Sequence, residues 1–141
     1  GKGAFPAFWT LGADFNLDGD IPSRQGYGWP ACGEIDIMEM IGGTIRTDET
    51  NEENQSNKVV YATPHFYYAN GDADKDGSYS PYALGRSIGM DDDFNDEYHI
   101  FGINWSEDRI EWYLDGEIYS TIEYDQSDAR INALINQNIS R

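Results

Sequence analysis

Three carboxylates lie within six residues of one another, in the segment 33–41, where Ile and Met occupy most other positions. They are Glu34, Asp36 and Glu39. In a β-strand successive side chains point to opposite faces, so Glu34 and Asp36 share a face and Glu39 takes the other. One extra residue, a β-bulge, would return Glu39 to the face of the first two acids. We therefore expect a bulged strand that gathers three acids on one face.

Such crowding has a cost, because neighbouring carboxylates cannot all ionise freely and at least one pKa should rise. A core gains nothing from it, whereas cleavage of a glycosidic bond needs a nucleophile or base beside a protonated acid. The alternative is an amphipathic helix, since Ile35, Met38 and Ile41 also fit helical spacing and the acids would then be a solvated face. Periodicity alone leaves both open. The bounding glycines and the nine-residue length favour the strand.

The surrounding segments are typical of strands joined by turns. Gly and Tyr are abundant, with 15 and 10 residues, and the aromatic share is 14%; these values favour an all-β chain. The Asp115-Gly116 pair between alternating apolar residues predicts a hairpin. We expect a buried strand over 5–11 and a second strand over 59–68, which Pro64 confines to an edge or a bulge. Residues 98–105 and 110–114 alternate as strands do, which would put Trp105 and Trp112 in the core. Residues 129–139 could form a helix or a strand, and loops are expected over 12–28, 44–58 and 69–97.

The composition and charge of the chain limit the classes of molecule that it could bind. Twenty-six acidic and nine basic residues give a net charge of −17, which disfavours nucleic acid and anionic membranes because both require clustered Lys and Arg. No apolar run is long enough to span a bilayer, and the single Cys32 allows no disulfide within the chain. No repeat or linker divides the chain, so we expect one domain over 1–141. We expect the chain to open within a domain, with any secretion signal either removed or outside the sequence.

The string Trp29–Glu39 resembles the signature of glycoside hydrolase family sixteen, in particular its laminarinase-like β-1,3-glucanases, which carry Glu-x-Asp-x-x-Glu. The lichenase branch of that family has Glu-x-Asp-x-Glu, one residue shorter. The resemblance covers residues 1 to about 120, with supporting matches at 6–13, 61–68, 98–105 and 112–116. It implies a β-jelly roll sandwich of two curved antiparallel sheets, with a substrate cleft on the concave face. Because the family domain extends beyond both ends of this chain, we expect the jelly roll to be incomplete at both ends.

The same resemblance implies a retaining double displacement. Glu34 would attack the anomeric carbon, Glu39 would protonate the leaving oxygen and then activate water, and Asp36 would hydrogen-bond a catalytic glutamate. Trp9 and Trp29 match positions that line the cleft as sugar platforms, with core packing as the alternative for each. His65 would bond Asp36, Glu39 or sugar, or be a structural histidine.

The implied substrate is a β-1,3- or mixed β-1,3/1,4-glucan, cut by a secreted monomer without a required cofactor. Two alternatives remain: a non-catalytic glucan-binding jelly roll, and a relative that cleaves agar- or porphyran-type galactans. We assign no metal to the site itself. Two acidic loops, Asp14–Gly19 and Asp72–Gly77, resemble calcium loops but lack the final glutamate. Each could hold structural calcium or be an acidic turn without metal.

Overall fold

The chain is built of short antiparallel strands, as the sequence predicts. A computed structural model describes residues 3–13, 29–30, 32–46, 53–67, 81–83, 85–125 and 127–138. Its elements are β1 (Ala7–Leu11), β2 (Glu34–Glu39), β3 (Thr44–Arg46), β4 (Glu53–Gln55), a 3₁₀ turn η2 (Ser56–Lys58), β5 (Val59–Tyr67), β6 (Pro81–Ala83), β7 (Arg86–Gly89), β8 (Phe101–Trp105), β9 (Arg109–Leu114), β10 (Glu117–Glu123) and the helix α1 (Ala129–Asn138).

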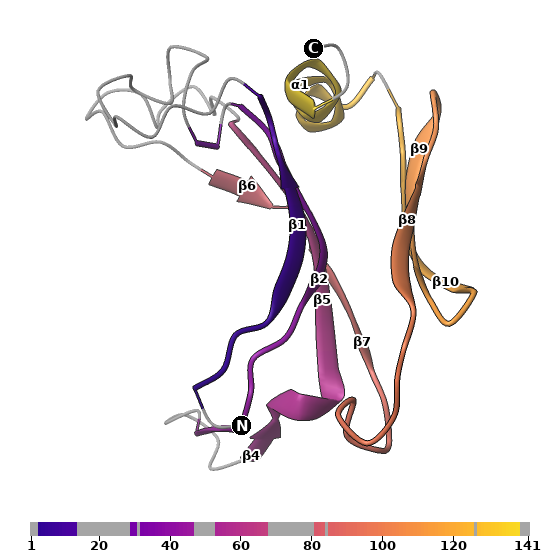
Figure 1. Ribbon diagram of the computed structural model, residues 1–141. Coiled ribbons are helices and arrows are strands. Elements are labelled where there is room, and N and C mark those ends of the chain that lie inside the picture. The colour runs from indigo at the N-terminus through magenta and orange to yellow at the C-terminus, as the bar shows by residue number, and fades with distance from the viewer. Residues whose placement is uncertain are drawn as a thin grey trace. The chain divides into compact units, whose positions relative to one another are not determined.

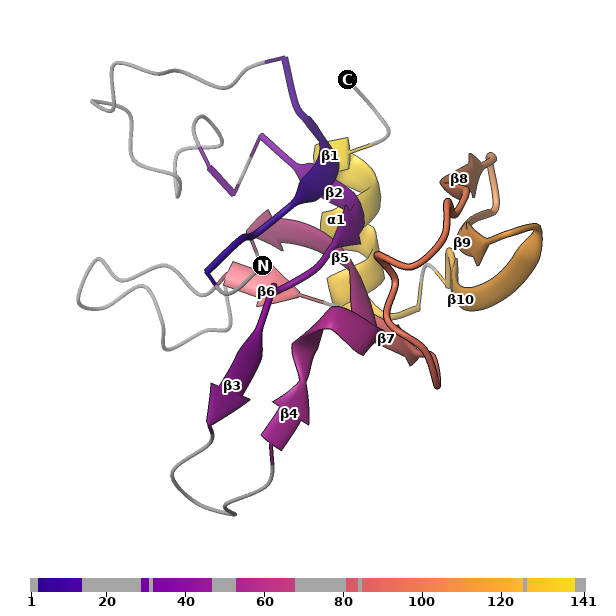
Figure 2. The ribbon, with the colours of Figure 1, turned by 60° about the horizontal axis from the view of Figure 1, so that its bottom comes forward.

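The described strands form three sheets (Figure 1). The largest has the order β1-β2-β5-β6, with β7 also paired to β5, and a second has the order β10-β9-β8. The third is the β3–β4 hairpin, whose two strands run side by side in Figure 2. The candidate strand β2 is thus an inner strand of the largest sheet, which constrains it from both sides.

The chain divides into two compact units. The first comprises the described residues of Gly1–Phe8, Asp36–Ala62 and Arg86–Ile122, and the second those of Trp9–Ile35, Thr63–Gly85 and Glu123–Arg141. Strands β2 and β5 each begin in one unit and end in the other.

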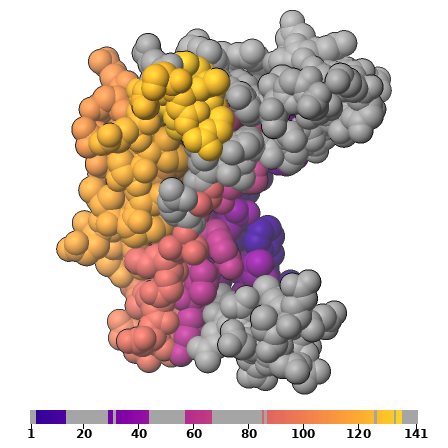
Figure 3. All heavy atoms as spheres, turned by 180° about the vertical axis from the view of Figure 1, so that it is seen from behind, coloured from indigo at the N-terminus to yellow at the C-terminus, as the bar shows by residue number. Residues whose placement is uncertain are grey.

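A sandwich core fills the first unit. Its centre is Val60 on β5, Leu114 on β9 and Phe94, with six partly buried side chains packed around them: Met38, Met40, Ile88, Met90, Phe101 and Tyr119. These residues come from both larger sheets, so burial of apolar surface joins the sheets face to face. In the space-filling view the surface of β7 adjoins that of β5, in agreement with their pairing over Val59–Ala62 and Arg86–Gly89 (Figure 3).

The β9–β10 hairpin confirms the Asp-Gly prediction. Asp115 and Gly116 have φ values of 52° and 90°, and two positive values suit a two-residue turn that matches strand twist. The Asp115 carboxylate also accepts hydrogen bonds from the Ile100 amide at 2.8 Å and from His99 Nδ1 at 2.7 Å. The His99 bond, followed by the Ile100 bond, lowers the pKa of Asp115 below its usual value. The turn is therefore tied to the chain that enters β8.

Pro64 does not confine β5 to an edge, because β5 lies between β2 and β6 in its sheet; the alternative, a bulge at Pro64, stays a prediction. The strand continues through Pro64 to Tyr67 because its neighbour changes there. Residues 59–62 pair with β7 and residues 65–67 pair with β6, so no ladder bond to either strand is needed at Pro64. A proline, which lacks an N–H, is tolerated at such a break.

The burial of β1 and of Trp105 also differs from what the sequence predicts. Strand β1 forms where expected, but Phe5, Phe8 and Trp9 are 59%, 54% and 48% exposed. β1 ends the strand order of its sheet, and none of the described residues covers it. Trp105, expected in the core, is 42% exposed, whereas Trp112 is buried as expected.

Two segments expected to be loops contain short strands, namely β3 and β4 within 44–58, and β6 and β7 within 69–97. The ambiguous tail is the helix α1. Asp128 caps it, since its side chain accepts from the Arg130 amide and its carbonyl from the Asn132 amide. Ile131 and Leu134, three positions apart, are the buried face of α1. No helix in the described part of the chain is long and apolar enough to cross a membrane.

Candidate active site

Two glycines set where β2 begins. Gly33 has a φ of 80°, a conformation that favours glycine. The Gly12 amide donates to the Gly33 carbonyl at 2.9 Å, and a Cβ built on Gly12 would lie 1.7 Å from the Cys32 carbonyl oxygen. The end of β1 therefore lies directly against the residues that precede Glu34. Thr10, also on β1, donates to the Ile35 carbonyl at 3.5 Å.

The face of Glu34 follows from its neighbour on β5. A carboxylate oxygen of Glu34 and a ring nitrogen of His65 lie within 4.8 Å of each other. Along β5, Val60 and Phe66 are buried in the core while Tyr61 is 36% exposed, so His65 and Tyr61 share the face away from the core. Glu34 lies on that face too, and Asp36, two residues further along β2, follows it.

The alternation of β2 breaks after Asp36. Strict alternation would keep Met38 on the face of Asp36, yet Met38 packs with Val60 in the core, and so does Met40. Ile37 is buried as well, with 6% of its surface exposed. Glu39 lies between these two methionines, and the bulge that would turn its side chain to the face of Glu34 stays a prediction. β2 is a strand over Glu34–Glu39, so the helix alternative is wrong.

Asp36 is held from the core side. It is 1% exposed, and its main-chain carbonyl accepts a hydrogen bond from Trp112 Nε1 on β9 at 2.9 Å. Trp112 was interpreted from the sequence as a core residue only. Its alternating apolar neighbours show burial, but no sequence pattern reveals a bond to a main-chain atom 76 positions away.

The other predicted site residues differ in their surroundings. Trp29 and His65 are ring neighbours, with centroids 5.6 Å apart and planes at 50°. Both are partly buried, so neither belongs to the closed core. Trp9 is 48% exposed on β1, which rules out the core-packing alternative. Cys32 is buried at 1% and has no part in the carboxylate chemistry.

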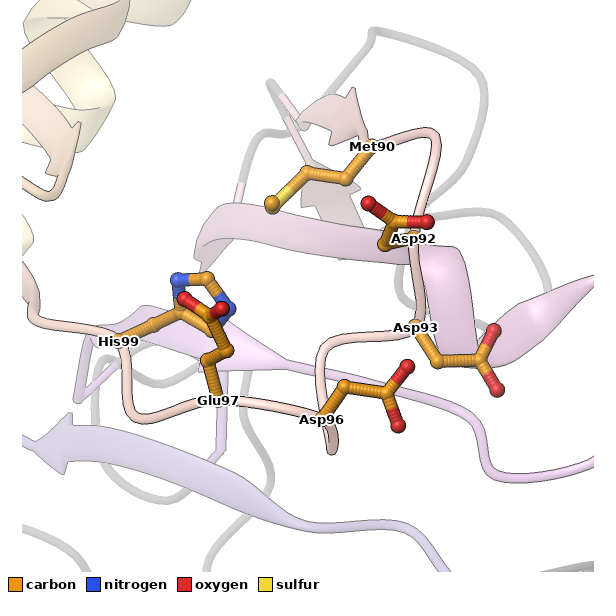
Figure 4. A pocket seen from close by; sticks show the side chains of 6 residues that line it. All are labelled: Met90, Asp92, Asp93, Asp96, Glu97 and His99. Atoms are coloured by element: carbon orange, nitrogen blue, oxygen red, sulfur yellow. The ribbon is translucent and has the colours of Figure 1, made fainter.

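An acidic hollow lies in the first unit. It has a volume of about 300 Å³ and is lined by Met90, Asp92, Asp93, Asp96, Glu97 and His99 (Figure 4). Within the described residues, it brings no three Asp, Glu, His or Cys ligand atoms within 4.8 Å of one another. It is therefore not arranged as a metal site. Both candidate calcium loops, Asp14–Gly19 and Asp72–Gly77, lie outside the described residues.

Comparison with known proteins shows the family to which this chain belongs. The model of glycosyl hydrolases family 16 matches residues 1–141. The chain belongs to glycosyl hydrolases family 16. It is 35% identical to the laminarinase catalytic domain of Thermotoga petrophila RKU-1, an endo-1,3-beta-glucanase, with a TM-score of 0.57 over 89% of this chain and 39% of that one. The jelly-roll prediction is thereby confirmed.

Relatives of this family 16 chain act on more than one polysaccharide. The glucan endo-1,3-beta-glucosidase of Cryptopygus antarcticus is 32% identical over 86% of this chain and 34% of its own length. The kappa-carrageenase of Pseudoalteromonas carrageenovora is 25% identical over 82% of this chain and 25% of its own. The chain thus spans about a third, or less, of the curated relatives it matches.

Proposed function

We propose that this family 16 chain carries the catalytic strand of a retaining endo-hydrolase of β-1,3- or mixed β-1,3/1,4-glucan. The observation that carries the proposal is the clustering of Glu34, Asp36 and His65, whose ligand atoms all lie within 4.8 Å of one another. The predicted bulge in β2 would add Glu39 to the same face. Without the bulge, one of the acids would point into a methionine-lined core. The glucanases among its relatives support the choice of substrate.

The chemistry divides between the two glutamates. The Glu34 carboxylate attacks the anomeric carbon and forms a glycosyl ester, while Glu39 donates its proton to the departing glycosidic oxygen. Glu39, now a carboxylate, takes a proton from water, whose oxygen displaces Glu34 and restores the original anomeric configuration. Asp36 lies between the two glutamates in the sequence and is buried. In the proposed mechanism its side chain hydrogen-bonds one of the two glutamates. Retention requires the two glutamate carboxyls to be about 5–5.5 Å apart.

The aromatic residues around Glu34 give the sugar a surface. We assign Trp29 to sugar stacking, since its ring is partly open and lies beside His65. His65, near Glu34, is assigned to a hydrogen bond with either the glutamate or a sugar hydroxyl. Trp9, exposed on β1, is a further platform. An uncharged glucan is unaffected by the net charge of −17, whereas a sulfated galactan is repelled by it.

Glycosyl azide formation tests the two roles. Glu34→Ala and Glu39→Ala should each lose most hydrolysis and keep the melting temperature, because each removes a reacting group and little core volume. With an activated aryl glucoside, azide should yield the α-glycosyl azide with Glu34→Ala and the β-glycosyl azide with Glu39→Ala. Glu117→Ala, at an exposed position of β10, is the matched control and should behave as the unmodified protein. Full activity in either site variant would end the mechanistic proposal.

A reducing-end assay on four polymers tests the substrate. We expect product from laminarin and lichenan, and none from agarose or kappa-carrageenan. Cleavage of a galactan instead would replace the glucan proposal with the second candidate, which the kappa-carrageenase relative supports. Tight glucan binding without any product, unchanged by Glu34→Ala, would indicate a binding module.

A further inference from the structure

The hydrogen bond between Trp112 and Asp36 crosses from one sheet to the other within the first unit. Trp112 lies in the middle of β9 and is 1% exposed. Its Nε1 donates at 2.9 Å to the main-chain carbonyl of Asp36 in β2. An apolar side chain of similar size could fill the same space in the core. Core packing therefore does not explain why the indole N–H bonds the Asp36 carbonyl.

The position of that carbonyl supplies one. In a regular sheet, a carbonyl points along the sheet towards the neighbouring strand and accepts from its amide. A donor from the facing sheet approaches it well only where the peptide is rotated out of that ladder. Such a rotation is what a bulge produces. Asp36 immediately precedes Ile37, which is buried, and Met38, which is partly buried and packs against the core cluster, and this is where the bulge is predicted.

We infer that Trp112 is a positioning residue of the catalytic strand, an inference that rests on the proposed function. Its indole N–H holds the peptide that follows Asp36 in the bulged orientation. That orientation produces the one-residue offset, and the offset turns Glu39 to the face of Glu34. Trp112 itself lies on the core side and does not touch the sugar, so its effect on the reaction passes through Glu39.

The inference makes a kinetic prediction that core packing does not. Without the donor, the bulge relaxes and Glu39 is displaced relative to the glycosidic oxygen. A displacement of about 1 Å costs roughly 100-fold in rate, so kcat should fall by between about tenfold and 100-fold. KM should stay within about twofold, because the sugar-binding aromatics are untouched.

Two replacements at the same position separate the donor from the volume. Trp112→Phe removes the N–H together with part of the ring. Site-specific replacement by β-(3-benzothienyl)alanine keeps the bicyclic shape and exchanges the N–H for sulfur. Trp105→Phe is the matched control: it loses an indole from the neighbouring strand, where the side chain is 42% exposed. We would measure kcat and KM on laminarin, the pH–rate profile and the melting temperature.

A readout independent of turnover is the pH titration of the Glu34 and Glu39 carboxyl carbons by ¹³C NMR. We expect both Trp112 replacements to change the titration of Glu39 and to lower kcat, with the control unchanged. If the benzothienyl protein matches the unmodified one in kcat, pH–rate profile and titration, Trp112 is a packing residue and the inference is overturned. If the unmodified chain cleaves no glycan but the Glu39 titration still changes, the coupling stands and the proposed function fails. If that chain cleaves no glycan and the titration is unchanged, both fail.

Discussion

A single methyl group at Gly12 is the sharpest available test of how β1 positions the acids. The Cβ introduced by Gly12→Ala would lie 1.7 Å from the Cys32 carbonyl oxygen, whereas ordinary contact begins at 3.4 Å. The two backbones must therefore separate by about 1.7 Å. The Gly12-to-Gly33 hydrogen bond, now 2.9 Å, would not survive that movement.

The size of the effect follows from these distances. Gly33 is buried, and without the Gly12 amide its carbonyl would keep only the weak bond from Cys32 Sγ at 3.7 Å. A buried acceptor that loses its main donor costs about 1–3 kcal/mol of stability. For a chain of this length, that corresponds to a fall in melting temperature of about 3–12 °C. Glu34 follows Gly33 directly, and a displacement of 1 Å or more should lower kcat roughly 100-fold.

The assay pairs a thermal melt with initial rates on laminarin, and Gly89→Ala is the control. A Cβ at Gly89 would lie 3.7 Å from the Lys58 carbonyl oxygen, which is ordinary contact. The control should therefore melt within about 1 °C of the unmodified chain, at an unchanged rate. If Gly12→Ala does the same, the contact between β1 and the start of β2 does not position the catalytic strand.

The remaining predictions concern the bulge, the helix cap and calcium. Deleting Met38 gives Glu-Ile-Asp-Ile-Glu, in which strict alternation keeps all three acids on one face. We expect the hydrolysis rate to stay within about tenfold of that of the unmodified chain, and the free energy of unfolding to fall by about 2–5 kcal/mol. Inserting Ala after Met38 instead points Glu39 into the core and should abolish hydrolysis in the same reducing-end assay. The Arg130 side chain lowers the pKa of Asp128 to about 2 from 3.8, so its cap should stabilise α1 fully above pH 3.8 and fail as pH falls through 2. Circular dichroism should show this loss in the unmodified chain but not in Asp128→Asn. If the Asp72–Gly77 loop binds Ca²⁺, chelator should lower the melting temperature and added Ca²⁺ should restore it; an unchanged curve would indicate an acidic turn without metal.

The strand β2 could be predicted because its signals are local: a short run of Ile and Met bounded by glycines. The burial of Asp36, which is 1% exposed, could not be predicted from that pattern. The Asp115-Gly116 turn was predictable because its signal is also local, since two residues fix the backbone that the turn needs.

Burial and short strands were not predictable, because both depend on neighbours that are distant in sequence. Trp105 alternates like a core residue, but whether it is covered depends on which strand lies beyond β8. Phe8 belongs to the run 5–11, which was expected to be a buried strand, and it is exposed because β1 ends its sheet. Strands of three or four residues, such as β3 and β6, carry too few positions to show a period.

The exposed aromatics of β1 have a practical consequence for handling the protein. Phe8 and Trp9 lie on β1, at the end of its sheet, and Phe5 precedes them; apolar edge strands of that kind tend to pair with other copies. Mutual repulsion between chains that each carry a net charge of −17 opposes this contact. Salt shortens the range of that repulsion to about 10 Å at 0.1 M. The protein should therefore stay dispersed in dilute buffer and lose colloidal stability as salt is added.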